Sequence, residues 1–126
     1  MKLKQISIFL ENSPGHLTKV CEAFALASIN MKTISIAETK DFGVMRVIVD
    51  NPEAASEALS KAGIASKLID VLALPVADKA GDFLRILNKA KSENLNVEYA
   101  YALSQNATTH MILRFNDMDK ASEIFA

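Results

Sequence analysis

The strongest constraint on the fold of this chain is an internal repeat with a spacing of 66 residues. Shifting the sequence by that distance over itself aligns six identical residues: Gly15 with Gly81, Asn30 with Asn96, Met45 with Met111, and Ala55-Ser56-Glu57 with Ala121-Ser122-Glu123. Apolar positions also align without a gap, as Leu17 with Phe83, Val20 with Ile86, Ile29 with Leu95, and Val47 with Leu113. Because both a strand period and a helix period persist through every loop, the repeat predicts two copies of one supersecondary unit.

The first copy has the pattern of a βαββαβ unit. Its apolar runs predict strands at 5–10, 31–39 and 44–49. A turn at 11–15 precedes a helix whose apolar face is Leu17, Val20, Cys21, Phe24 and Ala27. Pro14 is expected in the first turn of this helix, where its missing N–H is not needed. Residues 40–43 are expected to form a hairpin connection, and 50–52 to cap a second helix at 53–62.

An apolar segment at 66–76 joins the two copies. We expect it to be the last strand of copy one, running directly into the first strand of copy two. Pro75 cannot donate to a ladder, so it should lie at an edge or an irregularity. Copy two then predicts a helix at 80–94, strands at 97–104 and 108–115, and a helix that starts at 117. The expected domains are 1–70 and 71–126, and the second lacks its final strand, which indicates a truncated chain or a strand from a neighbouring chain.

A βαββαβ unit with two helices on one face of an antiparallel sheet is the ferredoxin-like arrangement, of the α+β class. One copy of about 60 residues is marginal alone, so the two copies are expected to pair side by side. The apolar strands at 44–49 and 66–76 offer more apolar surface than two small copies can cover. The chain is therefore predicted to form a homodimer or a larger assembly.

Composition narrows the function classes. A formal net charge of −1 without a basic stripe argues against a nucleic-acid partner, and no apolar run reaches the length of a membrane helix. The single cysteine, Cys21, permits no internal disulfide, so a reduced, cytoplasmic setting is expected. His16 and His110 lie in different copies, away from any set of metal ligands. Without a catalytic set or a phosphate-binding loop, the sequence predicts neither an enzyme nor a cofactor.

One loop carries a family resemblance. The segment Asn12-Ser13-Pro14-Gly15-His16-Leu17 resembles the Asn-x-Pro-Gly-x-Leu loop of ACT domains. Asn30 stands just before the second strand, where serine-sensing ACT domains also have an asparagine. The resemblance spans nearly the whole chain. Its specific motif is present in the first copy only, because the second has Asp78-Lys79-Ala80-Gly81 at the corresponding place.

ACT domains are regulatory modules that bind amino acids, usually at an interface between two of them. The resemblance implies an allosteric sensor in which backbone amides around Gly15 and the side chains of Asn12 and Asn30 contact an amino acid. A helix N-terminus suits the carboxylate, and a glycine lets a ligand approach the backbone. The candidate residues are Asn12, Ser13, Pro14, Gly15, His16, Leu17 and Asn30, with a weaker second site at Asp78, Gly81 and Asn96.

Each candidate residue also has a purely structural interpretation. Gly15 can serve the turn alone, Asn12 can cap the helix, and Asn30 can be a turn residue. In copy two, Asp78 can cap equally well, and its charge would repel a carboxylate. Leu10 replaces a histidine of the serine-sensing relatives, which indicates a more apolar pocket. The alternative function is a regulatory or assembly subunit of an amino-acid metabolic enzyme that no longer binds a ligand itself.

Overall fold

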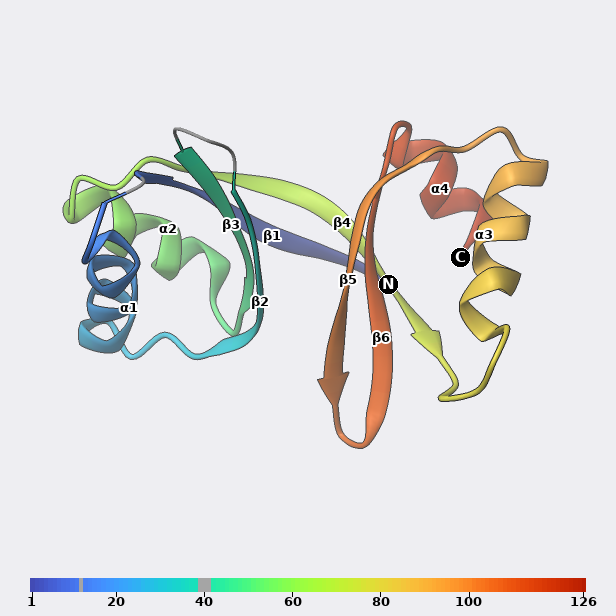
Figure 1. Ribbon diagram of the computed structural model, residues 1–126, viewed down its shortest axis with the longest axis horizontal. Helices are drawn as coiled ribbons and strands as arrows, with labels where there is room; N and C mark the ends of the chain where they lie inside the picture. The colour runs from blue at the N-terminus through green and yellow to red at the C-terminus, as the bar shows by residue number, and fades with distance from the viewer. Residues whose placement is uncertain (12, 39–41) are drawn as a thin grey trace. The chain divides into compact units, whose positions relative to one another are not determined.

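The computed structural model describes residues 1–11, 13–38 and 42–126. Its elements, drawn in Figure 1, are β1 (Lys2–Glu11), α1 (His16–Leu26), β2 (Met31–Glu38), β3 (Phe42–Val49), α2 (Pro52–Lys61), β4 (Ser66–Val76), α3 (Asp82–Ser92), β5 (Val97–Gln105), β6 (Thr108–Phe115) and α4 (Met118–Ile124). Every predicted strand and helix is present, with ends that differ by a few residues. Of the predicted hairpin connection at 40–43, residues 40 and 41 lie outside the described part, and residues 42 and 43 belong to β3 instead.

The chain forms two compact units. The first unit is Lys4–Ile69, and its strands lie in the order β2-β3-β1-β4. The second unit combines Met1–Leu3 with Asp70–Ala126, and its strands lie in the order β1-β4-β6-β5. The registers of β1 with β3, β2 with β3, β4 with β6 and β5 with β6 are all antiparallel. The prediction of two ferredoxin-like units is thus confirmed.

The N-terminal segment Met1–Leu3 occupies the place beside β4 where a final strand of the second unit would lie. The Ala73 N–H donates to the Met1 carbonyl oxygen at 2.8 Å, and the Met1 ammonium donates to the Ala73 carbonyl oxygen at 3.2 Å. This reciprocal exchange is the pattern of an antiparallel pair. The 66-residue shift carries Met1–Leu3 onto residues 67–69, which form part of the last strand of the first unit. Residues 1–3 therefore hold in the second unit the place that residues 67–69 hold in the first unit.

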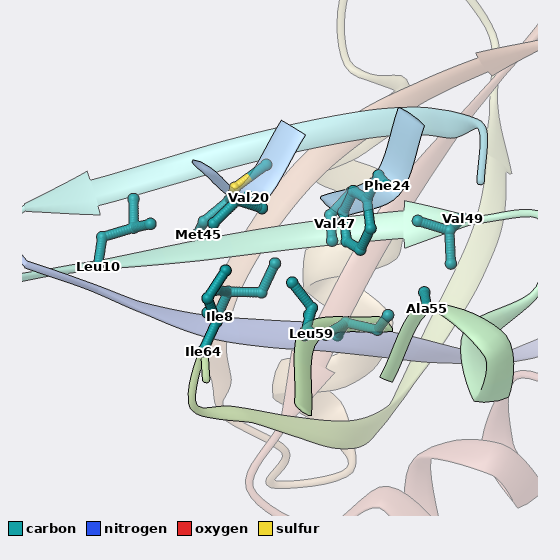
Figure 2. Packing of buried hydrophobic residues seen from close by; sticks show 11 residues of the cluster. Ile8, Leu10, Val20, Phe24, Met45, Val47, Val49, Ala55, Leu59 and Ile64 are labelled. Carbon is teal, nitrogen blue, oxygen red and sulfur yellow. The ribbon is translucent and has the colours of Figure 1, made fainter. Parts of the chain in front are cut away.

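The core of the first unit lies between its sheet and its two helices. Alternate residues of β1 and β3 face the helices, because Ile6 pairs with Val47 and Ile8 with Met45 in the antiparallel register. Figure 2 shows Leu10 at one end of this cluster and Ala55 of α2 at the other. The other buried residues of this cluster are Val20 and Phe24 of α1, Val49 of β3, Leu59 of α2, and Ile64. Of the apolar face predicted for α1, Val20 and Phe24 fill this core, whereas Cys21 is half-buried and Leu17 and Ala27 are exposed.

The core of the second unit follows the same plan. Leu72 and Leu74 of β4 pack with Leu113 and Phe115 of β6 and with the buried face of α3, and Phe125 stacks on Phe115 with ring centroids 5.6 Å apart. Pro75 lies within β4, opposite His110 of β6. Residues two apart in a strand direct their N–H groups to the same side, and the Ala73 N–H is directed toward Met1. The N–H that Pro75 lacks would therefore point away from β6, so the ladder between β4 and β6 loses no hydrogen bond at this residue.

Helix ends repeat from unit to unit. The Asn51 side chain accepts from the Ala54 N–H at the start of α2, and Asp117 accepts from the Lys120 N–H at the start of α4. The prediction that Pro14 lies in the first helical turn is wrong, since α1 begins at His16 after an N-cap at Gly15. Gly15 has φ +86°, which a right-handed helix does not accept. None of the helices described is long and apolar enough to cross a membrane.

Candidate functional site

The loop between β1 and α1 turns sharply at Gly15. The Ser13 N–H donates to the Glu11 carbonyl oxygen at 2.9 Å, and the His16 N–H donates to the Ser13 carbonyl oxygen at 3.4 Å. Gly15 then adopts φ +86° and ψ −5°, a left-handed conformation that residues with a Cβ avoid. Among the described residues, apart from Gly15 and its two chain neighbours, no heavy atom lies within 4 Å of an ideal Cβ built on Gly15. The backbone conformation, and not crowding by these residues, therefore accounts for the glycine.

The His16 side chain ties this loop to the end of β1. Its Nδ1 accepts the Glu11 N–H at 2.8 Å, which requires a ring without a proton on Nδ1. In the second unit Asp82 has the same role, since its Oδ2 accepts the Ala77 N–H at 2.6 Å. That bond, followed by the hydrogen bond from Arg85, lowers the pKa of the Asp82 carboxyl below its ordinary value. Sequence reasoning missed Asp82, although the 66-residue shift aligns it with His16.

The two helix starts differ in charge. The first turn of α1 contains no acidic residue, and in the part of the chain that the structure describes no side chain caps it. The first turn of α3 contains Asp82. The alternative interpretation of Asp78 as a helix cap does not hold for α3, because the N-cap is Gly81 and the cap makes no side-chain hydrogen bond. Asp82 thus places a negative charge in the first turn of α3, near the positive end of the helix dipole, whereas the first turn of α1 has no such charge.

A cavity of about 160 Å³ opens beside the first loop. We call it the loop cavity. Its lining includes the apolar residues Leu10, Leu17, Ile36 and Phe42 and the acidic residues Glu11 and Glu38. A second cavity of about 320 Å³ shares Leu10, Glu11 and Phe42 with it and reaches His16 and Ile64. The loop cavity therefore combines an apolar surface, two carboxylates and the start of a helix.

Most of the predicted first site gathers here. Ser13 and Leu17 line the loop cavity, and His16 lines the neighbouring cavity. Gly15 lies between them as the N-cap, and Pro14 is exposed on the same loop. The prediction for Asn12 falls outside the described residues.

Asn30 does not join this group within one unit. It follows the far end of α1, and eleven helical residues span roughly 16 Å at 1.5 Å per residue. Its N–H donates to Asp50 Oδ1 at 3.1 Å, and its carbonyl oxygen accepts the Asp50 N–H at 3.2 Å. The backbone of Asn30 therefore links the start of β2 to the end of β3.

The predicted second site is divided in the same way. Gly81 and Asn96 lie at opposite ends of α3, and Asp78 is exposed on the loop before that helix. Asn96 lines a separate cavity of about 490 Å³ that also contacts Lys91 and Asn116. The three predicted residues of the second unit therefore share no cavity in the described part of the chain.

Besides Leu10 and Glu11, which directly precede the predicted loop, four lining residues were not predicted from the sequence. Ile36 and Glu38 stand at the end of β2, and Phe42 and Gly43 begin β3. They reach the loop because Phe42 pairs with Glu11 and Ile36 pairs with Met45. Only the strand register places them there. Among the residues described, no group of three or more His, Cys, Asp or Glu side chains is arranged to bind a metal ion.

The model of a family described as an ACT domain pair matches residues 1–126. The acetolactate synthase small subunit of Buchnera aphidicola subsp. Baizongia pistaciae is 29% identical over 101 residues, which are 79% of this chain and 62% of that protein. The chain thus spans less than two thirds of that curated relative.

Solved structures show the same architecture. Protein BT0572 from Bacteroides thetaiotaomicron is 36% identical with a TM-score of 0.91, and the match covers 98% of this chain and 86% of that one. The ligand-free regulatory subunit of aspartate kinase from Thermus thermophilus is 19% identical with a TM-score of 0.65, over 97% of this chain and 87% of that one. At that identity, the second likeness is one of fold.

Proposed function

Because this chain belongs to the ACT domain pair family, we propose that it is a regulatory protein, and not an enzyme, that binds an amino acid at the loop between β1 and α1. One observation carries the proposal: the loop cavity lies beside a helix start whose first turn contains no acidic residue, and no side chain among the described residues caps it. Such a start offers N–H groups and a positive dipole end to a carboxylate. The second unit lacks this combination because Asp82 occupies its helix start.

The acidic residues that line the loop cavity suit the ammonium group of an amino acid. Glu11 and Glu38 both line it, and each carboxylate can accept hydrogen bonds from an ammonium group. A ligand held between these carboxylates and the start of α1 would have its carboxylate and its ammonium oriented in opposite directions. Recognition of both ends favours a free amino acid over a simple carboxylic acid or an amine.

The position of Asn30 supports a homodimer as the binding form. Since Asn30 lies at the far end of α1, a ligand in the loop cavity can contact only the Asn30 of another copy of the chain. β2 is the outer strand of the first unit. If β2 paired antiparallel with β2 of a second copy, the start of one strand would lie beside the end of the other, where Ile36 and Glu38 line the cavity. Light scattering should then give the mass of a dimer and not 13.7 kDa.

Calorimetric titration of the protein with each of the twenty amino acids tests the proposal. We expect saturable binding of at least one of them, with one strong site per chain. Absence of binding by all twenty at millimolar concentration would contradict it.

A second candidate is a regulatory or assembly subunit that binds no ligand. The likeness to a protein named acetolactate synthase small subunit favours it. In this case a catalytic subunit should co-purify with the tagged chain, and none of the twenty amino acids should change the amount recovered. An effect of one amino acid on that association would instead favour the sensor, acting on a metabolic enzyme as its partner.

A further inference from the structure

We propose that the helices of the first unit, α1 and α2, form a surface at which two copies of the chain associate. This contact goes beyond the proposed function and is additional to the pairing of β2. The surface contains a groove of about 320 Å³, which we call the helix groove, lined by Ala23, Leu26, Ala27, Ala58, Lys61 and Ala62. The groove shares none of its described lining residues with the loop cavity.

Leu26 is the most exposed large apolar side chain among the described residues, with 90% of its surface open to water. A single exposed leucine is ordinary on a protein surface. This one, however, lines a groove whose other apolar residues are all alanines. Short side chains on both helices let another helix approach them closely. The helix groove therefore combines a projecting side chain with room for a second one.

The second unit shows that the fold does not require apolar residues at these positions. The 66-residue shift aligns Ala23 with Lys89, Leu26 with Ser92, and Ala27 with Glu93. These three residues of the second unit are exposed, and Lys89 Nζ lies 5.2 Å from the centroid of the Phe125 ring. Since the same unit folds with polar residues there, the folding of the first unit does not account for its exposed apolar groups.

A second copy of the same surface suits the helix groove, because the surface carries both halves of a contact. A two-fold interface uses one patch on both sides, so this patch needs a projecting group and a matching recess. Leu26 is the projecting group, and the alanines of α1 and α2 line the recess. A two-fold axis would place each Leu26 against the alanines of the other copy, which removes apolar surface from water on both sides.

The charges of α2 favour one orientation of the two copies. Lys61 Nζ lies 3.1 Å from Glu57 Oε1, and 77% and 68% of these two side chains are exposed, so both remain accessible to another copy. If two α2 helices cross antiparallel near Ala58, each Lys61 lies beside the Glu57 of the second copy. A parallel crossing would place lysine beside lysine. Since opposite charges attract and like charges repel, the antiparallel contact is favoured.

Sedimentation equilibrium on a grafted variant tests the inference. The triple variant Ala23→Lys, Leu26→Ser and Ala27→Glu carries on α1 the residues that the second unit has at these positions. Loss of a leucine that each interface contains twice should weaken association about a hundredfold or more. At a protein concentration of about 1 mM, the wild type should therefore have about twice the mean mass of the variant. Equal masses would overturn the inference.

The grafted variant also separates this inference from the proposed function. None of its three changed residues lines the loop cavity, so any amino-acid binding of the wild type should persist in it. Backbone amide NMR over a dilution series locates the contact. The signals of Ala23, Leu26 and Ala58 should move with protein concentration, whereas those of Lys89 and Ser92 should stay in place. Movement confined to the second unit or to β2 would contradict the proposed surface.

A charge exchange on α2 tests the orientation and leaves the apolar residues unchanged. Lys61→Glu should weaken the association about tenfold, because like charges would then meet across the axis. Addition of Glu57→Lys to this variant should restore most of the association. Lys91→Glu is the control, since Lys91 is exposed on α3 outside the groove and its replacement changes the net charge equally. Equal weakening by Lys61→Glu and Lys91→Glu, or no recovery in the double variant, would refute the antiparallel contact.

Discussion

Gly15 and Gly81 adopt nearly the same conformation, with φ +86° and +88°, yet only Gly15 adjoins the loop cavity. Gly15→Ala and Gly81→Ala should therefore each destabilise the protein by about 1–2 kcal/mol, the cost of a left-handed residue with a Cβ. Only Gly15→Ala should also weaken amino-acid binding, because its methyl group would stand at the helix start. Thermal unfolding and calorimetry on both variants separate the effects. Equal affinities for the two variants would show that Gly15 serves the turn alone.

His16 and Asp82 perform one structural task with different charges. His16→Asp should preserve an acceptor for the Glu11 N–H, and therefore the loop, while it places a carboxylate in the first turn of α1. Repulsion near a surface is on the order of 1 kcal/mol, so the affinity for the amino acid should fall about tenfold. Asp82→Asn is the control and should leave affinity unchanged. Unaltered binding by His16→Asp would place the ligand carboxylate elsewhere.

At the scale of elements, the spacing of apolar residues predicted the strands and helices well, because the burial of one face of each element sets that spacing. The helix starts were less predictable. Residues 80 and 81 were expected inside a helix, but Gly81 has φ +88° and α3 begins at Asp82. Composition alone does not distinguish a glycine in a turn from one in a first helical turn. The β1–α1 loop was predicted as a site, whereas Ile36, Glu38 and Phe42 were not, since strand pairing brings them there from distant positions.

The Asp82 carboxyl, which accepts a hydrogen bond from the loop between β4 and α3, should make the free energy of unfolding depend on pH. The pKa of Asp82 is lowered in the folded protein, first by the Ala77 N–H and then by Arg85. A lowered folded-state pKa means that the contribution of the carboxylate is present at neutral pH and is lost as the pH falls through that lowered value. Urea midpoints of the wild type and of Asp82→Asn should therefore differ at pH 7 and converge in strong acid. A difference that stays constant down to pH 2 would contradict this link.

At the scale of the whole molecule, the second unit includes a segment from the start of the chain, Met1–Leu3. Removal of Met1–Leu3, for instance by release of a shortened chain from a cleavable tag, should destabilise the second unit, because Met1 pairs with Ala73. Hydrogen exchange should accelerate in α3 and α4 and change less in α1 and α2. Uniform acceleration, or none, would show that these three residues do not support the second unit selectively.

The central claim is that an amino acid binds at the loop of the first unit and not at its counterpart in the second. Titration of the ¹⁵N-labelled protein with each of the twenty amino acids, followed by backbone amide NMR, tests it most directly. With at least one of them, the amide signals of Ser13, Gly15, His16 and Leu17 should shift and saturate, while those of Lys79, Gly81, Asp82 and Phe83 should remain in place. Shifts confined to the second loop, or no shifts with any of the twenty amino acids at millimolar concentration, would contradict the account.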